Sequence, residues 1–159
     1  MKNNIFVDME EGCTTPSWFD KVEPFLQTVL EKLELDHWEL SVLFCRDPFI
    51  HELNRQYRKI DNPTDVLSFE NGDEYEDESG EAWVAAGDIV ISLDTLGSNC
   101  KEFSVTPDEE LKRLLVHGVL HLNGMDHTDN SPEQEMLVFQ EDFLKKLDYP
   151  QIISDSIWN

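Results

Sequence analysis

The sequence predicts an α/β (α+β) fold in a single domain, with a mixed sheet of about four strands backed by helices. The chain of 159 residues is long enough for one buried core and too short for two ordinary domains. Short runs of β-branched and aromatic residues alternate with segments of helical periodicity. Hydroxyl residues followed by proline mark helix starts, because the hydroxyl oxygen accepts free amide hydrogens and proline fits the first turn.

The strand candidates are short and rich in β-branched or aromatic residues. They cover residues 5–9, 38–44, 66–69 and 88–92. The order of these strands among the helices indicates a sheet of mixed direction.

The helix starts marked by proline are Thr15-Pro16, Thr106-Pro107 and Ser131-Pro132. The first of these helices is expected over 16–33, with a kink at Pro24 because proline removes an internal hydrogen bond. A second helix is expected over 48–57. The last is expected over 132–147, with an apolar side that docks on the sheet.

The chain is strongly acidic. Its 34 Asp and Glu against 12 Lys and Arg give a net charge of −22, while 40% hydrophobic residues argue against disorder. Such a field repels nucleic acids and anionic membranes as a whole, so an anionic substrate has to be held by a local site. Seven acids between 70 and 81, together with two glycines, predict a solvated acidic loop near 70–82 that connects two strands as a flexible hairpin.

Three widely spaced cysteines form no C-x-x-C pair, so neither a disulfide framework nor a thiolate zinc site is indicated. The N-terminal residues lack the apolar run of a signal peptide, and no later segment approaches a membrane span. We therefore expect a cytoplasmic protein without a membrane partner.

Three histidines lie close together in the segment 117–127, which reads H-G-V-L-H-L-N-G-M-D-H. On a helix His117 and His121 project from one face, and Gly124 lets the chain turn so that His127 can return. Three imidazoles suit one Zn²⁺ ion and leave a fourth position for water or substrate. Zinc-activated water can attack a phosphoryl or a carbonyl group, so the motif predicts a catalytic metal site.

Two other interpretations of the histidines are open. They can be satisfied polar residues at the edge of an apolar helix, although they lie about 80–120° from its apolar stripe. They can also hold a structural metal, although closed zinc sites usually recruit cysteines and four protein ligands. Asp126 either orients a ligand or activates solvent, or else only stabilises the turn.

The spacing also overlays the metzincin peptidase pattern, H-E-x-x-H-x-x-G-x-x-H. Gly118 stands where the peptidase needs its glutamate, which disfavours peptide hydrolysis and leaves metal binding intact. A zinc peptidase with a metzincin-like site, using another base, is therefore one alternative function. A noncatalytic acidic adaptor whose negative surface binds basic proteins is another.

A small basic group ends the predicted helix before the third strand. Arg58 can bind a phosphate bidentately and stabilise the charge that develops on a pentavalent phosphorus. Alternatively, Arg58 and Lys59 form a solvated helix end that interacts favourably with the helix dipole.

The segment 117–127 resembles, position by position, the H-G-x-L-H-L-x-G-x-D-H signature of the YbeY family of bacterial ribosomal RNA maturation factors. Asn54, Tyr57 and Arg58, the run 63–69 and the run 87–92 resemble the family's other motifs in order and spacing. The resemblance implies a zinc-dependent, single-strand-specific endoribonuclease acting in 3′-end maturation of the small-subunit (16S) rRNA and in ribosome quality control.

For the site, the resemblance implies that His117, His121 and His127 bind the metal and that Arg58 is needed for activity. The implied partners are single-stranded rRNA and ribosomal proteins or ribosome-associated factors, with no role for DNA. Because the general electrostatic term opposes RNA binding here, a ribosomal protein is expected to help deliver the substrate.

Overall fold

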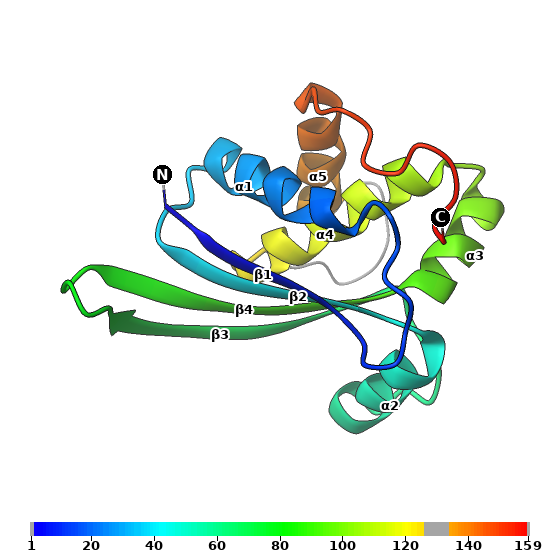
Figure 1. Ribbon diagram of the computed structural model, residues 1–159, viewed down its shortest axis with the longest axis horizontal. Coiled ribbons are helices and arrows are strands. Elements are labelled where there is room, and N and C mark those ends of the chain that lie inside the picture. The colour runs from blue at the N-terminus through cyan, green and yellow to red at the C-terminus, as the bar shows by residue number, and fades with distance from the viewer. Residues whose placement is uncertain (1, 126–133, 159) are drawn as a thin grey trace.

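A four-stranded mixed sheet carries helices on both faces (Figure 1) in the computed structural model, which describes residues 2–125 and 134–158. The elements are β1 (Asn4–Met9), the 3₁₀ turn η1 (Phe19–Lys21), α1 (Val22–Lys32), β2 (Trp38–Cys45), α2 (Asp47–Arg58), β3 (Val66–Glu76), β4 (Ala82–Ser92), α3 (Leu93–Phe103), α4 (Pro107–Leu122) and α5 (Glu135–Lys146). Within the described ranges, no helix combines the length and the apolar character needed to cross a bilayer.

The strand order is β1-β2-β4-β3. The β1–β2 and β2–β4 pairs are parallel, and β3 runs antiparallel to β4 at the other edge. This arrangement confirms the predicted mixed α/β sheet of about four strands in a single domain.

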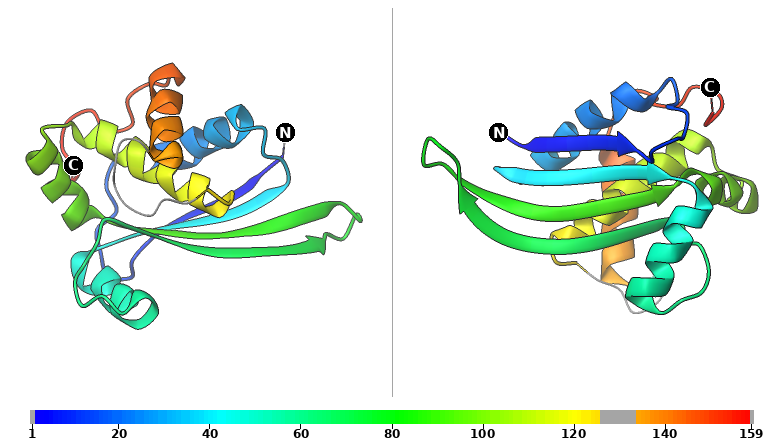
Figure 2. Two further views of the ribbon diagram at one scale, coloured as in Figure 1. Left: turned by 180° about the vertical axis from the view of Figure 1, so that it is seen from behind. Right: turned by 60° about the horizontal axis from the view of Figure 1, so that its bottom comes forward.

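The two faces of the sheet bury cores of different size. Helices α1, α4 and α5 lie on one face and α2 lies on the other (Figure 2). Along β4, Ile89 and Ile91 belong to the large core shared with α1 and α4, whereas Val90 belongs to a small cluster with Ile50 of α2. The alternation of side chains along a strand divides the two cores in this way.

Helix α4 lies very close to the sheet because its contact residue has no side chain. A Cβ atom added to Gly118 would be 2.7 Å from Cδ1 of Ile89 and 2.9 Å from Cγ1 and Cγ2. Gly87 makes a second close approach, since a Cβ there would meet the Phe69 carbonyl oxygen and Leu122. Both glycines therefore set the height of α4 over β4.

Helix α4 starts where the sequence predicts. Thr106 is the N-cap, and its Oγ1 accepts a hydrogen bond of 3.1 Å from the amide of Glu109. Helix α2 also matches its predicted range closely, and α5 begins at Glu135 within the predicted 132–147. The predicted cap Ser131-Pro132 lies outside the described residues.

The first helix is shorter than predicted. Thr15 caps no helix, because α1 begins only at Val22 after a 3₁₀ turn. Pro24 is thus the third residue of α1, where its missing N–H would have no partner within the helix. The kink predicted at Pro24 is wrong for this reason.

Helix α3 was not expected from the sequence. Ser92 caps it, and the Ser92 side chain accepts a hydrogen bond of 3.3 Å from the amide of Thr95. Only Leu93 and Leu96 of this helix are fully buried, so it lacks the long apolar stripe that usually indicates a helix. The capping serine was the available local signal.

The predicted acidic loop near 70–82 is wrong over most of its length. Strand β3 continues to Glu76 and β4 starts at Ala82, so only the short turn between them is irregular. The cross-strand partners explain why acids are tolerated here: Asp73 faces Ala85, Glu74 faces Val84 and Glu76 faces Ala82. No like charges stand directly opposite in these pairs, and the carboxylates point into solvent.

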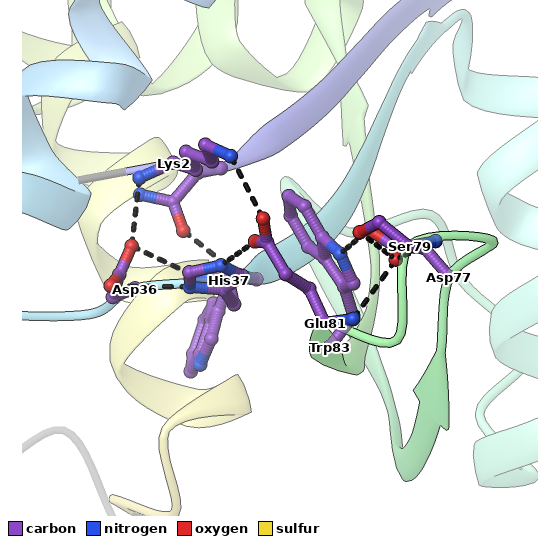
Figure 3. Close-up of polar contacts among 9 residues, drawn as sticks. Lys2, Asp36, His37, Asp77, Ser79, Glu81 and Trp83 are labelled. Atoms are coloured by element: carbon purple, nitrogen blue, oxygen red, sulfur yellow. Dashed lines mark hydrogen bonds and ion pairs between the residues drawn. The ribbon is translucent and has the colours of Figure 1, made fainter.

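The tip of this hairpin is fastened to the start of β2 by His37 (Figure 3). The His37 ring hydrogen-bonds Glu81 through Nε2 and lies 3.2 Å from Asp36 through Nδ1. Lys2 Nζ adds a 3.0 Å ion pair to Glu81, and the His37 ring packs edge-on against Trp83 at 4.8 Å between centroids. The backbone of His37 has φ +58°, a left-handed conformation that few residues other than glycine adopt.

The cluster of Lys2, Asp36, His37 and Glu81, here called the His37 latch, contains charges that stabilise one another. The hydrogen bond to Glu81 raises the pKa of His37, and Asp36 adds to the effect. The same hydrogen bond, together with that from Lys2, lowers the pKa of Glu81. At the turn, hydrogen bonds from Ser79 and Trp83 lower the pKa of Asp77 to about 2.

Replacing Gly118 by alanine tests the close approach of α4. Alanine favours a helix, but the new methyl group must displace Ile89 in a packed core, so we expect the free energy of unfolding to fall by about 1–2 kcal/mol. Urea denaturation measures this. The matched control is Gly97→Ala in α3, where a Cβ meets only Ile157 at 3.4 Å; it should be neutral or stabilising. A Gly118→Ala variant at least as stable as the wild type would contradict the close approach.

The His37 latch should depend on pH. Because its folded-state pKa is raised, His37 stabilises the hairpin fully below about pH 6.5 and loses this effect as the pH rises through the raised value. Glu81, with a lowered pKa, loses its contribution only at acidic pH. The amide of Val84 donates to the His37 carbonyl at 2.9 Å and reports on the latch.

We therefore expect the hydrogen-exchange protection factor of Val84 in the wild type to fall as the pH rises above about 6.5. In His37→Asn, which tolerates the left-handed backbone, the protection should not vary above this pH. Glu78→Gln, an exposed acid in the same turn, should behave like the wild type. The same decline in His37→Asn would assign the pH dependence to another group.

Candidate functional site

The C-terminal half of α4 presents two histidines on one face. The rings of His117 and His121 lie 4.7 Å apart between centroids at an interplanar angle of 69°. Both residues are half-buried, and their neighbours Val116, Val119 and Leu120 are fixed in the core. The predicted juxtaposition of these two imidazoles is therefore present.

The helix ends directly after these residues, as Gly124 predicts. Gly124 has φ +89°, its amide donates to the carbonyl of His121 at 3.0 Å, and the amide of Met125 donates to Leu120 at 3.0 Å. This pair of bonds is a Schellman motif, which reverses the chain after a helix. The turn therefore begins one residue after Leu122.

The predicted third ligand, His127, and Asp126 lie outside the described residues. Within ranges 2–125 and 134–158, no cluster of three or more His, Cys, Asp or Glu residues is placed to hold a metal ion. Two imidazoles on one helix face nevertheless suit a borderline ion such as zinc. The three-histidine metal site therefore stays a prediction.

His117 has a partner on another helix. Its Nδ1 lies 2.7 Å from Oε1 of Gln140 in α5, and Gln140 is only 3% exposed. A ring nitrogen held in this way is typical of metal-binding histidines, whose remaining nitrogen faces the ion. Sequence reasoning missed Gln140, although this polar residue follows the buried Met136 by one helical turn and so lies on the predicted core-facing side.

The glycine at 118 also explains the departure from the peptidase pattern. Ile89 occupies the space into which a side chain at 118 would extend. A glutamate in this position, as the metzincin pattern requires, would have to displace a fully buried residue. The position next to His117 thus serves the contact of helix and sheet.

Arg58 is placed differently from the histidines. It is the exposed last residue of α2, and α2 lies on the face of the sheet opposite α4 (Figure 1). Lys59 follows it in a left-handed conformation and ends the helix. Neighbouring Tyr57 is 65% exposed and packs edge-on against Phe69 of β3 at 5.3 Å. Whether Arg58 and the histidines share a site stays a prediction.

Asn54 shapes the chain that follows Arg58. Asn54 is 2% exposed. Its side-chain Nδ2 donates to the carbonyl of Asn62 at 2.9 Å, and its backbone carbonyl accepts the amide of Ile60 at 3.3 Å. These bonds close the turn between α2 and β3. Asn54 therefore supports the end of the helix on which Arg58 stands.

Comparison with known proteins gives consistent matches over most of the chain. The family model described as endoribonuclease YbeY matches residues 6–148. An endoribonuclease YbeY of Treponema denticola is 60% identical over 147 residues, covering 91% of this chain and 93% of that protein. The protein of the same name from Aquifex aeolicus is 41% identical over 134 residues, covering 84% of each chain.

A solved structure supports the fold independently. The solution structure of a Thermotoga maritima protein matches with a TM-score of 0.59 and 27% identity, covering 89% of this chain and 87% of that one. The match agrees with the mixed sheet and its covering helices. Since the family model and these relatives span nearly the whole described fold, the resemblance drawn from the sequence motifs is confirmed, and the chain belongs to the endoribonuclease YbeY family.

Proposed function

We propose that this protein is a zinc-dependent endoribonuclease that cleaves single-stranded RNA in 3′-end maturation of the small-subunit (16S) rRNA and in ribosome quality control. The observation that carries the proposal is the pair of half-buried imidazoles, 4.7 Å apart, on α4 of a chain in the endoribonuclease YbeY family. Cleavage of a phosphodiester by water requires an activated water molecule and stabilisation of the charge that develops on phosphate. A metal ion held by histidines can activate the water, and a cationic side chain can stabilise the charge.

His117, His121 and His127 are proposed to hold one zinc ion, with the fourth position left for water or substrate. When bound, zinc supplies Lewis acidity toward a phosphoryl oxygen and makes its water more acidic. The helix fixes the first two imidazoles relative to each other, and the Schellman motif at Gly124 ends the helix three residues before His127.

Arg58 is proposed to bind a non-bridging phosphate oxygen and to stabilise the charge that develops there. Two contacts bring α2 and α4 to the same stretch of sheet. Tyr57 packs on Phe69, while Leu122 lies over Gly87, which pairs with Glu70 next to Phe69. Since β3 is an edge strand, a single-stranded RNA can pass around it and reach both faces.

The charge of the chain bears on its partners. A net charge of −22 opposes unassisted binding of RNA, and the acidic hairpin adds to this repulsion. Basic ribosomal proteins or ribosome-associated factors are therefore proposed to bring the rRNA to the site. All three cysteines are free, which agrees with the proposed cytoplasmic location. The metallohydrolase domain is proposed to span residues 1–159.

The peptidase alternative is weaker, because Ile89 fills the space that the peptidase glutamate would need. The adaptor alternative predicts full function without metal, which the following variants test.

His121→Ala should abolish cleavage of single-stranded RNA and lower zinc content, because it removes one of three proposed ligands. Cleavage is followed with a labelled single-stranded oligonucleotide, and zinc by elemental analysis of the purified protein. His51→Ala is the matched control, since His51 is exposed and its ring nitrogen lies 2.8 Å from Asp61 of the same surface. RNA cleavage that survives complete chelation would contradict the metal mechanism.

Arg58→Ala should keep wild-type zinc content while turnover of RNA falls about 10²–10³-fold, the cost of removing a donor that stabilises charge in the transition state. Arg55→Ala is the control, because Arg55 lies one turn earlier and is already paired with Glu52. Zinc lost together with activity in Arg58→Ala would show a structural role, and unchanged turnover would remove Arg58 from the mechanism.

A further inference from the structure

A buried amide from α5 determines which nitrogen of His117 carries hydrogen. Oε1 of Gln140 lies 2.7 Å from Nδ1 of His117, and an amide oxygen can only accept. Nδ1 must therefore donate, which places the lone pair of the neutral ring on Nε2. A ring in this tautomer offers Nε2 as a ligand.

The orientation of the amide follows from its other end. Nε2 of Gln140 donates to Oε2 of Glu141 at 3.1 Å, and a carboxylate can only accept. A rotated amide would set its oxygen against this carboxylate. Burial opposes ionisation of Glu141, but hydrogen bonds from Arg113 and Gln140 keep its pKa below the usual value. Glu141 is thus an ionised acceptor that turns the oxygen of Gln140 toward His117.

Arg113 holds Glu141 in place with two hydrogen bonds. Nε donates to Oε2 at 3.0 Å and Nη2 donates to Oε1 at 3.1 Å. Arg113 precedes His117 by one turn of α4, so the two side chains share a face of the helix. The bonds from α4 through Glu141 and Gln140 therefore return to α4 at His117, and they link two helices through polar groups.

The same network extends to the start of β3. Nη1 of Arg113 donates to Oε1 of Glu110 at 3.2 Å, and Glu110 is 4% exposed. Nδ2 of Asn99 donates to Oε2 of Glu110 at 3.1 Å and to Oδ2 of Asp65 at 3.0 Å. Asp65 in turn accepts the amide of Val66 at 2.7 Å. A partly buried network in which each of these groups has a partner tolerates few other arrangements.

We propose that Gln140 is a positioning residue of the metal site: it fixes the tautomer and orientation of His117 so that Nε2 faces the ion, and Glu141 with Arg113 fixes Gln140. The inference rests on the proposed function, in which His117 is a zinc ligand. Hydrogen-bonded partners of this kind typically change metal affinity about 10–100-fold when removed.

The test uses the full-length protein and compares four variants. Gln140→Met keeps the length of the side chain and removes both polar atoms, whereas Gln140→Glu retains an acceptor for Nδ1. Glu141→Gln changes a side chain that is 44% exposed. It weakens the acceptor that orients the Gln140 amide and leaves the packing of the core unchanged. Asp142→Asn is the control on the same helix, since Asp142 is exposed and pairs only with Lys146 among the contacts described.

The first readout is nitrogen-15 NMR of the metal-free protein, which distinguishes imidazole tautomers. The wild type, Gln140→Glu and Asp142→Asn should show His117 with hydrogen on Nδ1, and Gln140→Met should show a mixture. The second readout is zinc affinity by competition with a chromogenic chelator. Gln140→Met should bind zinc about 10–100-fold more weakly than the wild type. Gln140→Glu and Glu141→Gln should lie between them, because Gln140→Glu keeps an acceptor for Nδ1 but sets its carboxylate against Glu141.

Urea denaturation of the metal-free variants checks that they fold. If Gln140→Met does not fold, Glu141→Gln is the variant that tests whether Gln140 positions His117. A wild-type tautomer together with wild-type zinc affinity in Gln140→Met, or in Glu141→Gln in that case, would overturn the positioning role. Neither readout uses RNA. If the zinc affinities of the wild type and the variants follow the expected order but the wild type cleaves no RNA, the proposed nuclease is refuted and the positioning role is supported.

Discussion

The contact of α4 with the sheet at Gly118 is the constraint on which the rest of the site depends. With no side chain at 118, the helix backbone reaches Ile89 directly, and the large core closes around this line of contact. The height of α4 over the sheet is fixed by that approach. His117, the residue before Gly118, lies about 100° around the helix from this contact and reaches α5, where Gln140 meets it. Two adjacent residues of α4 therefore have different roles: Gly118 lets the helix pack closely on the sheet, and His117 presents its imidazole to Gln140.

Hydrogen bonds restrict the rotation of α4, which the apolar contact at Gly118 leaves free to vary. Apolar packing holds a helix at a given depth but leaves small rotations about its axis inexpensive, whereas hydrogen bonds depend on direction. The network from Gln140 through Arg113 and Glu110 supplies that direction between α4, α5 and the start of β3. Such a network costs desolvation, and its hydrogen bonds restrict the orientation of the groups that they join.

Seven acidic residues of the chain lie between 70 and 81, in the β3–β4 hairpin. The β3–β4 hairpin carries its carboxylates into solvent beyond the core, and the His37 latch holds its tip against the start of β2 (Figure 3). The basic end of α2 lies near the other end of β3. Between 51 and 69 the basic residues Arg55, Arg58 and Lys59 balance Glu52, Asp61 and Asp65, so this segment is neutral in a chain of net charge −22.

The sequence by itself determined the features that arise from contacts a few residues apart: the Thr106 cap, the shared face of His117 and His121, and the helix end at Gly124. Helical periodicity and capping chemistry fix these without reference to the rest of the chain. The tertiary structure alone decided the course of the acidic hairpin, whose partners lie on β4, and the pairing of His117 with Gln140, 23 residues away. It also decided the face of the sheet on which Arg58 stands. These features depend on how distant segments pack, and local patterns carry no information about that.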